Sequence, residues 1–178
     1  MKRTLSIFVA VLIILGFGVV WKLEKPAPKV TNFAECAAVT GVVSESYPRQ
    51  CRYNGQTFAE DIGNELEKTD LIRLNAPRPN QTISSPLKIE GEARGIWFFE
   101  ASFPVFVVDW DGRIIGQGIA QAQGDWMTQD FVPFSAVVEF ETPTYKNIGS
   151  LIFKKNNPSG LPENDDALEV PIVFSEIQ

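Results

Sequence analysis

Apolar and polar residues alternate along much of the chain between positions 71 and 174. In the run 168–174, for example, every second residue is a large apolar one. Because successive side chains of a strand point to opposite faces of a sheet, a period of two predicts strands with one buried face. Turn residues such as Asp111-Gly112 separate the runs. We expect seven strands, at 71–74, 86–93, 99–109, 113–122, 132–140, 148–154 and 168–174.

Seven short strands spaced by turns within about 108 residues are typical of two packed sheets. The Cys–Trp–Cys core of antibody domains is absent from this region. Since the chain contains 13 Phe and 4 Trp, aromatic and aliphatic packing is expected to form the core instead. The sequence therefore predicts a mainly β fold, with a seven-stranded β-sandwich over residues 71–178.

Several segments of the predicted sandwich resemble the immunoglobulin-like domain of bacterial spore germination. These segments are Ile83–Gly95, Trp97–Phe103, Asp111-Gly112, Pro133–Ser135 and Gly149–Phe153. The resemblance spans nearly all of residues 71–178 and implies an immunoglobulin-like fold in a bacterial envelope protein. The loop region 156–166 departs from the family pattern. The resemblance supplies neither binding residues nor a role in sporulation.

The N-terminal part of the chain contains an uncharged apolar run, residues 4–21, after two basic residues. As a helix its 18 residues measure roughly 27 Å, near the lower limit for spanning a bilayer. Positive charge before the run keeps that end in the cytoplasm. We therefore expect residues 1–24 to be a single-pass anchor in the bacterial cytoplasmic membrane, with the C-terminal region extracytoplasmic. The alternatives are a cleaved signal peptide, for which Gly16 and Gly18 are weak signals, and a buried core helix.

A stalk and a small cysteine-containing segment follow the anchor. Prolines make residues 25–32 an extended stalk, and the segment 33–68 holds the chain's two cysteines, Cys36 and Cys51. In an oxidising compartment we expect them to pair, and closing a loop of about 15 residues stabilises a fold by about 3 kcal/mol. So small a segment buries little core and benefits from a cross-link. Because the chain has no histidine, a zinc site on these thiolates is disfavoured.

Three local signals predict structure within this segment. Asn32 is expected to cap a helix that runs through Ala38 and ends at Gly41. Asn54-Gly55 predicts a tight turn. The sequence Thr57–Glu60 matches a capping box and predicts a second short helix.

Charge and composition exclude several classes of function. From Lys25 onward, 13 basic residues face 21 acidic ones, and the net charge of −8 argues against nucleic acid or anionic lipid heads as partners. The lack of histidine removes Ser–His and Cys–His nucleophiles and the main zinc ligand. Asp109 and Asp111 are a carboxylate pair, but their place at a hairpin turn favours a structural role. We therefore predict a protein that is not an enzyme and uses no metal or cofactor.

Four residues are candidates for binding. Exposed aromatic rings bind sugar rings or partner proteins, which draws attention to Trp97, Trp110 and Trp126. Trp126 is expected to be exposed on a loop, since Gly124-Asp125 before it favours a turn. For all three rings the alternative is packing at the ends of the sandwich. Arg49, in the loop that the disulfide would close, is a candidate docking residue or an ordinary solvated side chain.

Two functions follow from these residues. The first is a membrane-anchored, extracytoplasmic binding or scaffolding module that recognises an envelope glycan or protein. The second is a regulatory or inhibitory envelope protein that acts through the Cys36–Cys51 loop.

Overall fold

The computed structural model describes residues 27–175. They belong to two compact units, one that extends to Ala59 and one that begins at Glu60. The predicted anchor at residues 4–21 lies outside the described residues. Within residues 27–175, no helix is long and apolar enough to cross a membrane.

The first unit contains the helix predicted from its caps. Helix α2 (Phe33–Thr40) begins after Asn32, whose side-chain oxygen accepts a hydrogen bond from the Glu35 backbone N–H at 2.9 Å. The helix ends at Gly41, which adopts a left-handed conformation with φ 64° and donates its N–H to the Ala37 carbonyl. Both predicted ends of this helix are confirmed.

An antiparallel hairpin follows the helix. Strand β1 (Gln50–Tyr53) pairs with β2 (Gln56–Ala59) around the predicted Asn54-Gly55 turn. The helix predicted at Thr57–Glu60 is wrong, because the first three of these residues belong to β2. Alternation along β2 buries Phe58, and this burial outweighs the local capping signal.

The disulfide joins the helix to the hairpin. Cys36 of α2 is bonded to Cys51 of β1, as predicted, and both side chains are buried. With Phe58 they form the small core of this unit, against which four half-buried side chains pack: Val30, Phe33, Val43 and Tyr53. So small a core explains why the segment carries a covalent cross-link.

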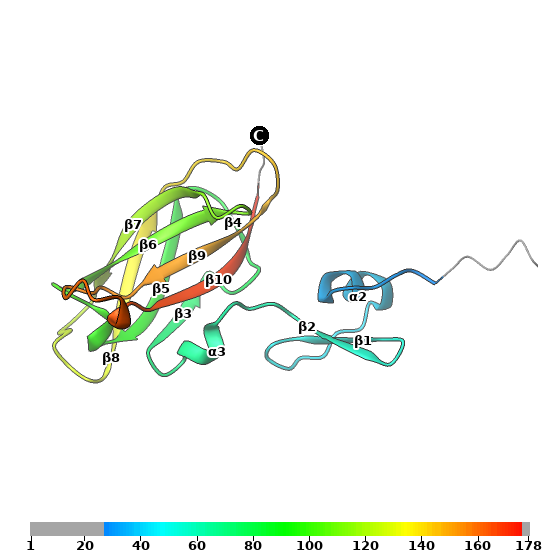
Figure 1. Cartoon of the computed structure of the whole chain (residues 1–178), viewed down its shortest axis with the longest axis horizontal. Helices are drawn as coiled ribbons and strands as arrows, with labels where there is room; N and C mark the ends of the chain where they lie inside the picture. Colours follow the sequence, from blue (N-terminus) through cyan, green and yellow to red (C-terminus); the bar gives the residue numbers. More distant parts are fainter. Residues whose placement is uncertain (1–26, 176–178) are drawn as a thin grey trace, which may run out of the picture. The chain divides into compact units, whose positions relative to one another are not determined.

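The second unit is a β-sandwich. In the described chain its strands are β3 (Ile72–Ala76), β4 (Thr82–Ile83), β5 (Leu87–Arg94), β6 (Ser102–Asp109), β7 (Ile114–Ala122), β8 (Phe131–Val138), β9 (Ile148–Lys154) and β10 (Ala167–Phe174). They follow the order β3-β5-β8-β7-β6-β9-β10-β4. Strands β7 and β8 pair only through Gln121–Ser135 and Ala122–Phe134, so the hydrogen-bonded order folds over at this point into two layers (Figure 1).

Seven of these eight strands were predicted in place, and β4 was not. Strand β4 has only two residues, which pair in parallel with Val173 and Phe174 at the end of β10. The strand predicted from residue 99 begins at Ser102, because a short 3-10 helix, η1 (Gly95–Trp97), and a turn precede it. The remaining short helices are α3 (Glu65–Lys68) and η2 (Pro162–Asn164).

Aromatic rings fill the space between the layers. Phe103 of β6 meets Phe134 of β8 edge to face, with ring centroids 4.9 Å apart. Phe134 also lies 6.3 Å from Phe153 of β9. All three side chains are buried, as expected for a core without an internal disulfide.

Asn64 closes the outer edge of β10 beyond β4. Its side-chain oxygen accepts the Glu169 N–H at 2.8 Å, its amide nitrogen donates to the Ala167 carbonyl at 3.0 Å, and its backbone N–H donates to the Glu169 carbonyl at 3.2 Å. One asparagine thus replaces a strand partner. These bonds tie residues 60–68 to the sandwich, although the sequence had placed them in the two-cysteine segment.

An ion pair covers the other edge strand, β3. Arg78 donates to the Leu74 carbonyl and pairs with Glu65 at 2.9 Å. Burial raises the pKa of Glu65, and the Arg78 guanidinium opposes this rise. Through its bond to the Leu74 carbonyl, Arg78 satisfies one backbone acceptor of this edge strand.

Loss of the disulfide is expected to affect the first unit alone. Replacing Cys36 by Ala should lower the free energy of unfolding of that unit by up to about 3 kcal/mol, because the open chain regains conformational freedom. The melting temperature of the sandwich should stay unchanged, since Cys36 is not among its core residues. Limited proteolysis of the full chain, read by mass spectrometry, would locate the change. Cleavage confined to the sandwich, or two free thiols in unreduced wild-type protein, would contradict the assignment.

Candidate functional site

Trp97 is a core residue. It lies in η1, directly before β6, and its side chain is 0% exposed. Its indole N–H has no hydrogen-bond acceptor within the described residues. The possibility of a surface ring at Trp97 is therefore wrong, and the alternative of packing at the end of the sandwich is correct.

Trp126 lies on the loop between β7 and β8, as predicted, but it is only half exposed and packs against the core. Neighbouring Gly95 shows how tightly this loop sits, because a Cβ at Gly95 would lie 2.3 Å from the Trp126 carbonyl and 2.0 Å from that of Thr128. This end of the sandwich is closed by its own loops. The expectation of a fully exposed ring at Trp126 is corrected.

Arg49 belongs to the first unit and contacts an aromatic ring there. Its guanidinium carbon lies 5.4 Å from the centroid of the Phe33 ring, within the range of a cation–π contact. The loop that carries it is closed by a hydrogen bond from the Ser44 N–H to the Gln50 carbonyl at 2.8 Å. Tyr47 in this loop is 49% exposed.

Trp110 differs from Trp97 and Trp126 because it is 42% exposed. It directly follows β6, at the end opposite to Trp97. Its ring lies 5.3 Å from that of Tyr145, and the Lys146 ammonium lies 4.3 Å from the Trp110 centroid. Tyr145 and Lys146 come from the β8–β9 loop, so two loops distant in sequence meet at Trp110. We call these three residues the Trp110 cluster.

Asp109 holds the turn that presents Trp110. One carboxylate oxygen accepts the backbone N–H groups of Asp111 and Arg113 at 3.1 and 3.0 Å, and the other accepts the Arg113 guanidinium at 3.2 Å. Desolvation acts to raise the pKa of Asp109, but these hydrogen bonds and the Arg113 charge outweigh it and leave the pKa below its ordinary value. The Asp109 carboxylate therefore stabilises this turn, to which Asp111 contributes its backbone N–H.

A groove of about 370 Å³ lies beside Trp110. Asp61 and Glu169 are exposed lining residues, and within the described residues neither forms an ion pair. One carboxylate oxygen of Asp61 accepts the Gly63 backbone N–H at 2.9 Å, which leaves the other oxygen for a ligand. Asn80 is held in place because its side-chain amide donates to the Asp61 carbonyl at 2.7 Å and to the Glu60 carboxylate at 3.1 Å. The remaining lining residues come from β6, the turn after it, β9 and β10: Val108, Asp109, Gly112, Ile148, Gly149, Ser150, Pro171 and Ile172.

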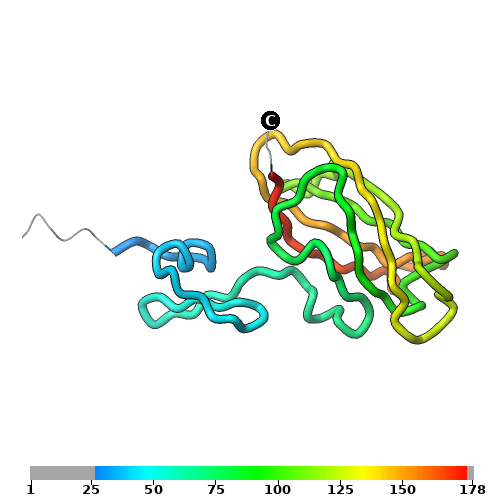
Figure 2. Tube along the Cα trace, turned by 180° about the vertical axis from the view of Figure 1, so that it is seen from behind, coloured from blue at the N-terminus to red at the C-terminus, as the bar shows by residue number. Residues whose placement is uncertain are grey.

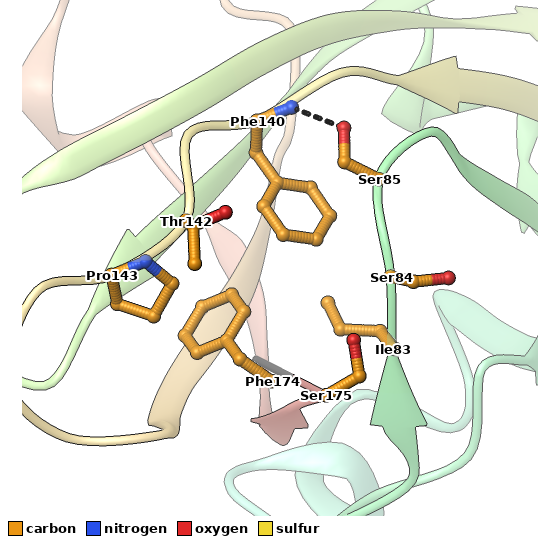
Figure 3. A pocket seen from close by; sticks show the side chains of 8 residues that line it. All are labelled: Ile83, Ser84, Ser85, Phe140, Thr142, Pro143, Phe174 and Ser175. Atoms are coloured by element: carbon orange, nitrogen blue, oxygen red, sulfur yellow. Dashed lines mark hydrogen bonds between the residues drawn. The ribbon is translucent and has the colours of Figure 1, made fainter. Parts of the chain in front are cut away.

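A smaller pocket of about 120 Å³ opens at the same end of the sandwich (Figure 3). Its apolar walls are formed by Ile83, Phe140 and Phe174, and the two rings have centroids 5.5 Å apart. The remaining lining residues are Ser84, Ser85, Thr142, Pro143 and Ser175. Ser85 is engaged, since its hydroxyl accepts the Phe140 backbone N–H at 3.0 Å.

The two openings share the β8–β9 loop. Thr142 and Pro143 border the smaller pocket, whereas Tyr145 and Lys146 contact Trp110 beside the groove. Figure 2 shows this loop crossing that end of the sandwich, next to the C-terminal end of β10. The arrangement offers aromatic surface, carboxylate acceptors and hydroxyls, which suits binding. Within the described residues, no three His, Cys, Asp or Glu side chains gather where they could hold a metal.

Trp110 was identified from the sequence, but its partners were not. Tyr145 carried one usable signal, because an aromatic residue after Pro143 in a polar stretch is expected in a loop. Asn80 and Asp61 gave no such signal. The order of the strands in the sheets determines which loops lie side by side. The alternation of apolar and polar residues does not reveal this order.

Neutralising Asp109 should weaken the Trp110 turn. We expect Asp109→Asn to lower the melting temperature at pH 7, because the charge and the bond to the Arg113 guanidinium are lost. The pKa of Asp109 is lower in the folded protein than in the unfolded chain. The stabilisation from its ionised carboxylate is therefore present above the unfolded pKa of 3.8 and is lost as the pH falls through the lower, folded pKa. The difference between variant and wild type should therefore shrink in acid. Thermal melts from pH 7 to pH 2 measure it, with Asp111→Asn as a matched control that changes little. A pH-independent difference would contradict the assignment.

A comparison with protein-family models bears on the sandwich. The model of the immunoglobulin-like domain of bacterial spore germination matches residues 71–160, about half of the chain. No curated protein and no solved structure matches the chain. The match covers β3 to β9 and agrees with the two-layer fold. The chain therefore belongs to the family of immunoglobulin-like domains of bacterial spore germination.

Proposed function

We propose that the chain is an extracytoplasmic binding module of the bacterial envelope, held at the membrane by residues 4–21, and that it binds an envelope glycan at the Trp110 cluster. The observation that supports this most is a 42% exposed tryptophan beside a groove of about 370 Å³. Trp110 is not isolated, since the exposed Tyr145 lies against it, and contiguous exposed apolar surface often marks a site of interaction.

The chemistry of the groove favours a glycan over a purely apolar ligand. A sugar ring has an apolar face, which packs on an indole, and a rim of hydroxyls, which need acceptors and donors. Asp61 and Glu169 supply carboxylate acceptors, and the groove adds the Ser150 hydroxyl. A few polar groups around an apolar surface are the usual composition of a small-molecule site.

The rigidity of the Trp110 cluster supports the same proposal. Asp109 fixes the turn before the ring, and the β8–β9 loop braces the ring through Tyr145 and Lys146. A binding group that is already ordered loses little conformational entropy when the ligand arrives.

Removal of the Trp110 ring should abolish binding without unfolding the domain. A core Trp→Ala change costs about 3–5 kcal/mol, whereas a half-exposed ring at a turn costs far less. We expect Trp110→Ala to keep most of the melting temperature and to lose retention on purified cell-wall polymer. Pull-down of the full chain with that polymer measures the effect. Retention equal to wild type would disprove the site.

Arg49→Ala is the matched control and also tests the second candidate function. Regulation through the Cys36–Cys51 loop draws support from the exposed Tyr47 and from the covalent closure of that loop. If the glycan proposal holds, Arg49→Ala binds cell-wall polymer like wild type. Loss of an envelope protein partner in Arg49→Ala, with Trp110→Ala unaffected, would favour the regulatory function instead.

The proposed location has its own test. A reporter fused after the last residue should be active only outside the cytoplasm, because two positive charges precede the apolar run. Added protease should digest the chain in intact spheroplasts. Activity of a cytoplasmic reporter at this position would overturn the proposed topology, whatever the ligand.

A further inference from the structure

The smaller pocket combines an apolar interior with hydroxyl groups at its rim. Its interior is formed by Ile83, Phe140 and Phe174, and Figure 3 shows all three side chains directed into the opening. The hydroxyls of Thr142 and Ser175 turn toward the same space, whereas that of Ser84 points away. An apolar interior with hydroxyls at its rim selects a group that is apolar at one end and polar at the other.

Two of these hydroxyls are available to a ligand. Within the described residues, the side-chain oxygens of Thr142 and Ser175 form no hydrogen bond, in contrast to Ser85, which accepts from Phe140. A hydroxyl can both donate and accept, so the pair can serve a ligand carbonyl and a ligand N–H together.

We propose that this pocket takes the acetamido group of an N-acetylated sugar. The acetamido methyl packs on the accessible part of the Phe140 ring, since the Phe140 and Phe174 rings already contact each other and Phe174 is buried. The acetamido carbonyl and N–H meet the hydroxyls of Thr142 and Ser175. The inference rests on the proposed glycan function and deepens it, because it names the class of sugar: a glycan that contains N-acetylhexosamine.

The size of the pocket agrees with this group. A single water needs roughly 10–15 Å³ measured in the same way, so a pocket of about 120 Å³ accepts several non-hydrogen atoms. An acetamido group and the adjacent edge of a sugar ring fit this space, whereas a whole disaccharide does not.

The pocket and the Trp110 cluster lie within reach of one oligosaccharide. Pro143 borders the pocket, and Tyr145, two residues later, contacts Trp110. Two residues of extended chain span at most about 7 Å, so Pro143 and Tyr145 keep the pocket and the cluster on one short stretch of loop. In this proposal one sugar lies at Trp110, and the acetamido group of another sugar of the same oligosaccharide lies in the pocket.

The test compares two trisaccharides that differ in this group. N,N′,N″-Triacetylchitotriose, called chitotriose below, carries acetamido groups at the positions where cellotriose carries 2-hydroxyls. Isothermal titration of the full chain in mild detergent should show tighter binding of chitotriose. Thr142→Val removes one hydroxyl and keeps the side-chain shape, so it should weaken chitotriose binding about two- to tenfold and leave cellotriose unaffected. Thr144→Val, on the exposed part of the same loop, is the matched control and should bind like wild type.

Each outcome has one meaning. Chitotriose selectivity that is lost in Thr142→Val and kept in Thr144→Val supports the assignment. Equal binding of both trisaccharides, abolished by Trp110→Ala and unchanged by Thr142→Val, would overturn the acetamido pocket and leave glycan binding intact. Binding of neither trisaccharide nor cell-wall polymer by wild-type protein would overturn both proposals.

Discussion

The two layers of the sandwich are joined by the contact of Phe103 with Phe134, and the position of the Trp110 cluster depends on this contact. The rings meet edge to face with centroids 4.9 Å apart, and Phe134 reaches Phe153 as well. Because all three rings are buried, they fix β6 and β9 against β8. Trp110 follows β6, and the β8–β9 loop joins the other two strands. Packing in the core thereby determines where the Trp110 cluster assembles.

Polar side chains form hydrogen bonds with backbone groups that have no partner in a neighbouring strand. Asn64 satisfies the backbone of Ala167 and Glu169 at the edge of β10, and Asp109 satisfies two N–H groups in the turn after β6. Buried or edge backbone groups need partners, and these two side chains provide them, Asp109 within its own turn and Asn64 from a segment distant in sequence. The segment that carries Asn64 also brings Asp61 to the groove. The same segment therefore covers the edge of β10 and lines the groove beside Trp110.

The alternation of apolar and polar residues predicted seven strands. Each of them has one face in the core, and a strand with one buried face carries apolar residues at every second position. Strand β4 was missed because two residues contain no period. The capping signal at Thr57–Glu60 failed for a different reason: Phe58 is drawn to the disulfide core, and tertiary packing prevailed over a local preference. The site was predicted in part. Trp110 stood out as an aromatic residue at a turn, but Asn80 and Tyr145 join it only through the order of the strands.

The three tryptophans of the sandwich show why residue type alone does not identify a binding surface. At one end, η1 and the β7–β8 loop approach so closely that a Cβ at Gly95 would collide with two carbonyls, and Trp97 and Trp126 pack into the core there. At the other end, the β8–β9 loop borders a pocket and leaves Trp110 42% exposed. The difference arises from how each loop crosses its end of the sandwich. The end formed by η1 and the β7–β8 loop is filled by its own side chains, whereas the end that contains Trp110 keeps an exposed ring beside an open groove.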